Sequence, residues 1–126
     1  MITATIGKEH FKTELTANGL HAVADEAVEQ GGGRQGPAPE EYLQMALAAC
    51  TAITLRMYAD RKHWAVEKIH VEVSSQKSAD TTILKRNISI DGVLDSDQRD
   101  RLLHIANSCP VHKTLTNPIE IRTSLQ

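Results

Sequence analysis

The sequence MALAACTAITL, residues Met45–Leu55, decides the fold because it predicts a helix with no charged residue on any face. Pro39 suits the first turn of this helix, and Glu40 and Glu41 lie favourably at the positive end of its dipole. The helix extends to about Lys62. A helix that is apolar all round must be covered on every side, and one sheet with one helix layer cannot enclose it in so small a protein. We therefore expect an obligate homodimer in which a second subunit covers the rest of the helix.

Strands are expected before this helix. Asn18-Gly19 separates the segments 11–17 and 20–24, and Asn-Gly is a strong hairpin signal because both turn positions need a positive φ. The glycine-rich stretch Gly31–Gly36 follows, and its composition predicts a mobile loop.

Two further strands and a second helix are expected after the long helix. Apolar and polar residues alternate over Ile69–Val73, and Leu84–Ile90 is the expected partner strand. Asp95 and Gln98 have the spacing of a capping box that opens a helix, and Pro110 stops that helix.

A final strand is expected over Ile119–Leu125. This order of elements predicts an α+β fold, with a mostly antiparallel sheet around a long, central, buried helix. Residues 1–126 are expected to form a single domain.

Composition excludes several classes of protein. The 126 residues are 40% hydrophobic, but only 3% are aromatic and the net charge is −2, which argues against a nucleic-acid-binding surface. No apolar run approaches the roughly 20 residues that span a bilayer, and no secretory signal opens the chain. We expect a cytoplasmic protein with no nucleic-acid or membrane partner.

The two cysteines are the main candidates for chemistry. Cys50 lies in the apolar helix, where it could simply pack as a small hydrophobic residue. Burial disfavours the thiolate, so a reactive Cys50 needs a cation from elsewhere; Arg34 is the best-placed candidate and Arg56 a weaker one. Cys109 could anchor the end of a helix, or it could cap a further short helix that begins at Pro110, where the dipole favours a thiolate.

A metal site is a weaker interpretation of the same region. Cys109 and His112 lie three residues apart, and Cys50 and His63 could be recruited, but the paired spacings typical of zinc are missing. The glycine loop does not match the phosphate-binding pattern either. We expect neither a metal nor a cofactor.

The stretch Gly36–Leu43, continuing to Cys50, resembles the OsmC/Ohr family of thiol peroxidases. That family opens its central helix with Pro-Glu and places its peroxidatic cysteine ten residues after the glutamate, here Glu40 and Cys50. Its second cysteine lies in a Cys-Pro motif after a helix, which Cys109-Pro110 matches.

Two further segments, Thr54–Ala59 and Cys109–Leu115, look more like the broad OsmC-like branch than the organic hydroperoxide resistance enzymes. The resemblance implies an antioxidant stress-response enzyme that reduces organic or inorganic hydroperoxides. It also implies an intertwined homodimer with two active sites at the subunit interface.

In the scheme that the resemblance implies, Cys50 attacks the O–O bond as a thiolate and becomes a sulfenic acid. Cys109 then resolves it as a disulfide, which a dithiol such as a lipoyl group or a thioredoxin-like protein reduces. Glu40 would orient the activating arginine. The family's arginine lies in the strand region well before the helix, and Arg34 is the first arginine of this chain. Either Arg34 takes that role or the usual activation is missing.

Helix geometry constrains the place of Glu40. Ten residues at about 1.5 Å rise separate Glu40 from Cys50 by roughly 15 Å and by about 80° of rotation. The two residues could share a site only if the helix breaks or if Glu40 comes from the other subunit.

Two other functions fit the same sequence. The chain could be a non-catalytic domain of this fold that binds an apolar ligand, with both cysteines buried. It could also be a thiol redox sensor whose disulfide changes partner binding without turnover.

Overall fold

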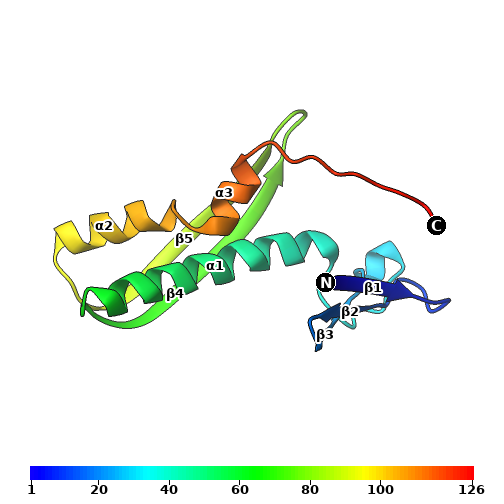
Figure 1. Ribbon diagram of the computed structural model, residues 1–126, viewed down its shortest axis with the longest axis horizontal. Helices are drawn as coiled ribbons and strands as arrows, with labels where there is room; N and C mark the ends of the chain where they lie inside the picture. The colour runs from blue at the N-terminus through cyan, green and yellow to red at the C-terminus, as the bar shows by residue number, and fades with distance from the viewer. The chain divides into compact units, whose positions relative to one another are not determined.

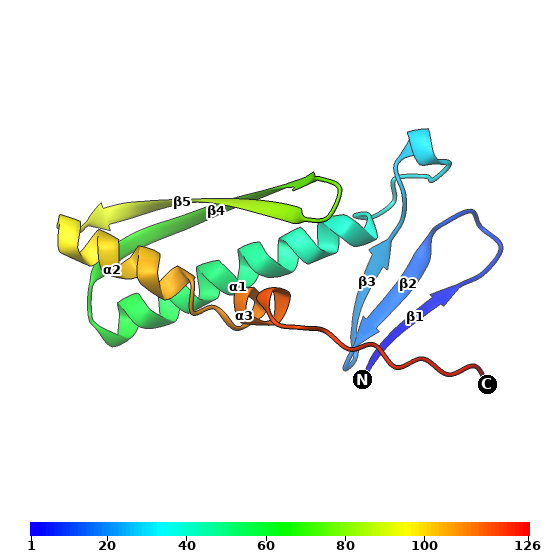
Figure 2. The same cartoon turned by 90° about the horizontal axis from the view of Figure 1, so that it is seen from above.

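The computed structural model describes residues 1–126, which fold into two compact units, Met1–Leu43 and Gln44–Gln126. Figures 1 and 2 show the elements of each unit. The expected single domain over the whole chain stays a prediction. The observed elements confirm the α+β fold class, with antiparallel sheets and helices.

The first unit contains a three-stranded antiparallel sheet of β1 (Ile2–Ile6), β2 (Thr13–Ala17) and β3 (Leu20–Ala24). The predicted hairpin is confirmed: Asn18 and Gly19 have φ of 50° and 90°, as a two-residue turn between these strands requires. β2 begins at Thr13 rather than at residue 11, because a turn closed by Lys12 N–H and the Glu9 carbonyl occupies the preceding residues.

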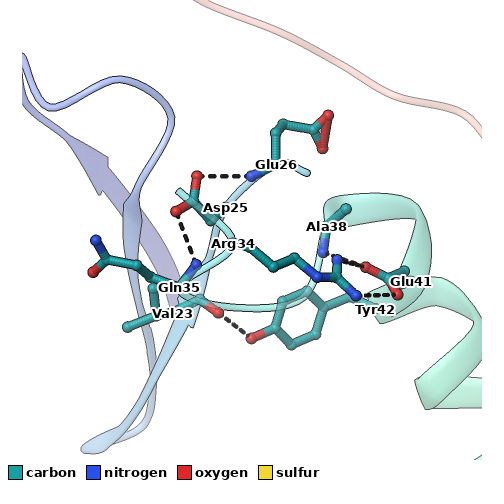
Figure 3. Close-up of polar contacts among 8 residues, drawn as sticks. All are labelled: Val23, Asp25, Glu26, Arg34, Gln35, Ala38, Glu41 and Tyr42. Carbon is teal, nitrogen blue, oxygen red and sulfur yellow. Dashed lines mark hydrogen bonds and ion pairs between the residues drawn. The ribbon is translucent and has the colours of Figure 1, made fainter. Parts of the chain in front are cut away.

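A buried carboxylate organises the glycine loop that follows the short helix η1 (Val28–Gln30). Asp25 is 2% exposed, and its Oδ2 accepts from Gln35 N while its Oδ1 accepts from Glu26 N and Gly33 N. Figure 3 draws the contacts to Glu26 and Gln35. These backbone bonds, that from Gln35 above all, lower the pKa of the Asp25 carboxyl. Asp25 therefore stays ionised and holds both ends of the loop.

The second unit contains most of helix α1 (Pro39–Arg61) and the hairpin of β4 (Ala65–Lys77) and β5 (Thr82–Val93). Its strands pair in antiparallel register, with Ile69 opposite Ile90 and Val71 opposite Ile88. Both predicted strands are thus confirmed, with longer bounds than the alternation indicated.

Two short helices complete this unit. α2 (Ser96–Ala106) opens with the predicted capping box, in which Gln98 N donates to Asp95 Oδ1 over 2.7 Å and Asp95 N donates to Gln98 Oε1 over 2.9 Å. α3 (Pro110–Thr116) begins at the proline that stops α2 from continuing. The core lies where α1, β4 and α2 meet, and its buried members are Leu55, Ala59, Val66, Leu102 and Ala106.

The two apolar faces of helix α1 differ in how far they are buried. One stripe at intervals of four residues is buried, and it consists of Leu47, Thr51, Leu55 and Ala59. The opposite stripe is exposed in this chain, with Met45, Ile53 and Met57 at 49%, 56% and 60%. A single subunit therefore covers only part of a helix that carries no charge over Met45–Leu55.

The predicted final strand over Ile119–Leu125 is wrong. Residues 117–126 form neither helix nor strand, and Ile121 and Leu125 are 83% and 100% exposed. The alternating apolar residues of this segment suit a strand, but a strand forms only beside another strand, and neither sheet of this chain pairs with it. None of the helices combines the length and hydrophobicity needed to cross a membrane.

Candidate functional site

The fold brings the two cysteines together. Cys50 comes from the middle of α1 and Cys109 from the junction between α2 and α3, and the two thiols are neighbours, because the Cys50 side chain lowers the pKa of Cys109. Both are free thiols. Cys109 is fully buried, whereas Cys50 is half-buried and also lies 3.9 Å from Thr54 Oγ1. Of the pair, Cys50 is thus the sulfur that solvent can reach.

Cys109 is the N-cap of helix α3. Its Sγ accepts a hydrogen bond from the backbone N–H of His112 over 3.5 Å, and Pro110 occupies the first helical position, where no N–H is needed. The predicted short helix after Pro110 is therefore confirmed, with Cys109 as its cap.

The surroundings of Cys109 favour its thiolate. Burial raises the pKa of the Cys109 thiol, but hydrogen bonds from the Cys50 thiol, the His112 and Val111 amides and the Thr51 side chain lower it, and the net shift is downward. The surroundings of Cys109 thus favour its thiolate more than burial alone would allow.

Thr51 connects this thiol pair to a cation that the sequence analysis missed. Thr51 is fully buried, its Oγ1 lies 2.7 Å from the Leu47 carbonyl oxygen, and it accepts from Arg86 Nη1 over 3.0 Å. A hydroxyl has one proton, so Thr51 can direct it either to the Leu47 carbonyl or to the Cys109 sulfur. Arg86 donates to a lone pair of Thr51 Oγ1, so this contact does not use the hydroxyl proton of Thr51.

Arg86 is held by two further neutral acceptors. Its Nη2 donates to Asn107 Oδ1 over 2.9 Å and to His112 Nδ1 over 3.2 Å. Because arginine can only donate, His112 Nδ1 accepts this bond and carries no proton. Arg86 therefore joins β5 to α1, to the end of α2 and to α3.

A signal in the sequence could have found Arg86. Leu84, Arg86, Ile88 and Ile90 alternate with exposed residues along β5, and all four are half-buried on one face of the strand. A charged residue in an inward position of an otherwise apolar strand face is unusual unless it has buried polar partners. The apolar members of this pattern predict the strand, and the arginine between them was not among the predicted site residues.

A cavity of about 410 Å³ lies beside this network. Arg86, Asn107 and His112 line one part of it, and the rest is lined by two threonines, Thr82 and Thr116, and by five aliphatic side chains: Leu47, Leu84, Ile88, Leu103 and Leu115. The site thus combines a pair of thiols, a cation and an apolar hollow within the second unit.

The predicted cation Arg34 has a different carboxylate partner from the one expected. Its Nη1 and Nη2 donate to Glu41 Oε1 and Oε2 over 2.6 and 3.3 Å, and Glu41 Oε1 also accepts from Ala38 N (Figure 3). The bond from Arg34, with that from Ala38, lowers the pKa of Glu41 to about 2. The paired carboxylate is Glu41, one residue after the Glu40 that the resemblance implies.

Helix α1 runs unbroken from Pro39 to Arg61, so the helix break considered above for joining Glu40 to Cys50 does not occur. The roles assigned to Glu40 and Arg34 stay predictions. Arg56, the weaker candidate cation, donates to the carbonyls of Val66 and Glu67 over 2.8 and 3.2 Å.

No group of three or more histidine, cysteine, aspartate or glutamate side chains is placed to hold a metal ion. What the arrangement offers instead is dithiol chemistry. One sulfur is accessible, and the other is buried among hydrogen-bond donors that stabilise its thiolate.

Known proteins share features of this sequence and this fold. The sequence matches the family described as OsmC-like protein over residues 31–124. No curated protein matches it.

Solved structures share the fold. An OsmC-like protein from Mycoplasma pneumoniae is 20% identical with a TM-score of 0.77, covering 91% of this chain and 85% of that one. An organic hydroperoxide resistance protein OsmC from Legionella pneumophila is 22% identical with a TM-score of 0.66, covering 92% and 88%. The organic hydroperoxide resistance protein OhrB of Bacillus subtilis is 21% identical with a TM-score of 0.63, covering 92% and 89%.

Proposed function

This chain belongs to the OsmC-like protein family, and we propose that it reduces organic or inorganic hydroperoxides with the Cys50–Cys109 dithiol. The observation that carries the proposal is the pair of neighbouring free thiols, one half-buried and one capping a helix. Two proteins of similar fold are hydroperoxide resistance proteins, which supports organic hydroperoxides as the substrate class.

In the first proposed step, the Cys50 thiolate attacks the terminal oxygen of the hydroperoxide. A S–O bond forms and the O–O bond breaks, so Cys50 is oxidised to a sulfenic acid. The departing alkoxide takes a proton and leaves as the alcohol. Cys50 suits this step because it is the more accessible sulfur.

The first step requires Cys50 as a thiolate, so the thiol proton has to leave this sulfur before the attack. Cys109 is the neighbouring thiol, and the Cys50 side chain interacts with it.

In the second proposed step, Cys109 attacks the Cys50 sulfur. A S–S bond forms, the S–O bond breaks, and hydroxide leaves as water after protonation. The lowered pKa of Cys109 suits this resolving role, because the amide and hydroxyl donors around it favour its thiolate. A dithiol, such as a lipoyl group or a thioredoxin-like protein, then supplies two electrons and restores both thiols by exchange.

A homodimer is part of the proposal. The exposed apolar stripe Met45, Ala49, Ile53 and Met57 runs along α1 on the side opposite the core, and Cys50 lies next to it in the sequence. A second copy packed on this stripe would bury it and would shield the thiol from bulk water.

Thiol counting after peroxide treatment tests the chemistry. Cumene hydroperoxide or hydrogen peroxide is expected to remove both thiols of each chain and to form an intramolecular Cys50–Cys109 bridge, detected by mass spectrometry. Cys109→Ser should stop at a Cys50 sulfenic acid that a dimedone probe captures. Two free thiols that persist in excess peroxide would contradict the proposal. This result would favour a non-catalytic domain that binds an apolar ligand.

Turnover separates an enzyme from a redox sensor. With dihydrolipoamide as the dithiol, the protein is expected to consume hydroperoxide continuously, and Cys50→Ser should abolish this activity. A bridge that forms once, without turnover by dihydrolipoamide or by a thioredoxin-like reductant, would favour the sensor instead. Sulfenic acid captured on Cys109 in the Cys50→Ser protein would reverse the two cysteine roles.

A further inference from the structure

The cavity in the second unit has two chemically distinct parts. Five aliphatic side chains form its apolar part, and its polar lining consists of Arg86, Asn107 and His112 with the threonines Thr82 and Thr116. Its volume of about 410 Å³ falls within the range of about 300–1,000 Å³ typical of small-molecule sites. The peroxidase scheme uses neither part, because neither cysteine lines this cavity.

The charge of Arg86 lacks a carboxylate partner. Its acceptors are the Thr51 hydroxyl, the Asn107 amide oxygen and His112 Nδ1, which are all neutral groups. A guanidinium has five N–H donors, and these contacts engage three of them. The remaining donors and the unbalanced positive charge suit an anion.

The apolar part restricts which anion fits. A small inorganic ion would leave the aliphatic side chains in contact with water, whereas an alkyl chain would displace that water and gain free energy with each methylene buried. Leu47, Leu84 and Leu115 belong to three different elements, so the chain would contact side chains from more than one side.

We propose that this cavity binds an amphipathic carboxylate, with its alkyl chain against the aliphatic side chains and its carboxylate on Arg86. Binding is non-covalent and leaves the two thiols unchanged. The proposed ligand is therefore distinct from the hydroperoxide, and its binding does not depend on the proposed peroxidase activity.

Calorimetric titration of the reduced, full-length protein with decanoate tests this site. One decanoate is expected to bind per chain, and affinity should rise roughly fourfold for each methylene added from hexanoate to decanoate. Methyl decanoate, which has the chain without the charge, should bind at least about tenfold more weakly. Equal binding of decanoate and its methyl ester would overturn the proposal, and so would an absence of binding.

Two arginine variants and an NMR measurement of where decanoate binds complete the test. Arg86→Met should weaken decanoate binding at least about tenfold, whereas Arg56→Met, a matched loss of an arginine outside this cavity, should leave it unchanged. Amide chemical shifts should change at Asn107 and His112 of the unmodified protein when decanoate is added. Shifts confined to the exposed stripe of α1 would place the ligand elsewhere and refute the site, even if Arg86→Met fails to fold.

Discussion

Arg86 donates a hydrogen bond to the fully buried hydroxyl of Thr51 over 3.0 Å, and so links strand β5 to the core face of helix α1. The same hydroxyl lowers the pKa of Cys109. A charge on one element is therefore connected to a thiol on another through a single buried oxygen. This relationship gives Arg86 a part in the site although it contacts neither sulfur directly in the hydrogen bonds observed.

Replacing Thr51 with valine tests that link. Valine keeps the shape but removes the hydroxyl, so Arg86 loses a buried acceptor and Cys109 loses a donor. We expect a loss of about 1–3 kcal/mol in the free energy of unfolding and a rise in the pKa of Cys109. Chemical denaturation measures the first, and ultraviolet thiolate absorbance in a Cys50→Ser background measures the second.

Thr51→Ser is the matched control for this experiment. It retains the hydroxyl and removes only a methyl group, so the pKa of Cys109 should stay close to that of the parent protein. A thiolate titration that is the same for the valine and serine variants would show that Thr51 does not influence Cys109.

The capping role of Cys109 can be separated from its redox role. Serine is a good N-cap and alanine is not, so Cys109→Ser should retain helix α3 while Cys109→Ala should cost about 1 kcal/mol more in stability. Neither variant can form the bridge to Cys50. Equal unfolding free energies for the two variants, measured in urea, would show that the contact from His112 N to the sulfur does not stabilise the helix.

The Arg34–Glu41 pair predicts a specific pH dependence. The pKa of Glu41 is lowered from 4.5 to about 2, so its contribution to the folded state is fully present above about 4.5 and is lost as the pH falls through about 2. Arg34→Gln should move the pKa of Glu41 back toward 4.5, and carboxyl-carbon NMR titration measures it. Lys12→Gln, which removes the partner of Glu14 instead, should leave the Glu41 titration unchanged.

Interactions between residues close together in the sequence were sufficient to predict most helices and strands. The Asn18-Gly19 turn, the capping box at Asp95 and the long helix from Pro39 each depend on residues that are neighbours in the sequence, and the structure confirms all three. The strand expected over Ile119–Leu125 failed because its formation depends on a partner strand, which alternation alone does not supply.

The site was only partly predictable for a related reason. The two cysteines could be selected because their residue type carries chemistry, and the structure brings them together. Arg86 was missed because its importance arises from contacts with Thr51, Asn107 and His112, which lie 21 to 35 residues away in the sequence. A search for charged residues on inward strand positions would have selected it.

Two glycines of the first unit provide a test of loop packing. A Cβ at Gly36 would overlap the backbone carbonyl of Val23, whereas a Cβ at Gly7 would meet nothing within 4 Å. Because backbone cannot give way as a side chain can, Gly36→Ala should destabilise the protein by about 1–3 kcal/mol, and Gly7→Ala should have little effect. Thermal unfolding compares the two, and equal melting temperatures would contradict the observed packing of the glycine loop on β3.

The exposed stripe of α1 provides the sharpest test of the proposed dimer. Ile53 lies at the middle of this stripe and is 56% exposed in the single chain. If a second copy covers it, Ile53→Lys would bury an unpaired charge at the interface, which is costly enough to dissociate most dimers of ordinary size. We expect a dimer for the parent protein and loss of that dimer for Ile53→Lys in sedimentation equilibrium.

Val93→Lys is the control for this substitution. Val93 is 87% exposed and lies at the end of β5, outside the α1 stripe, so a lysine there adds the same charge at a position that is not part of the proposed interface. The Val93→Lys protein should therefore remain a dimer. A monomeric parent protein, or an Ile53→Lys protein that sediments as a dimer, would show that the exposed stripe does not join two copies, and the shielding proposed for Cys50 would then need another source.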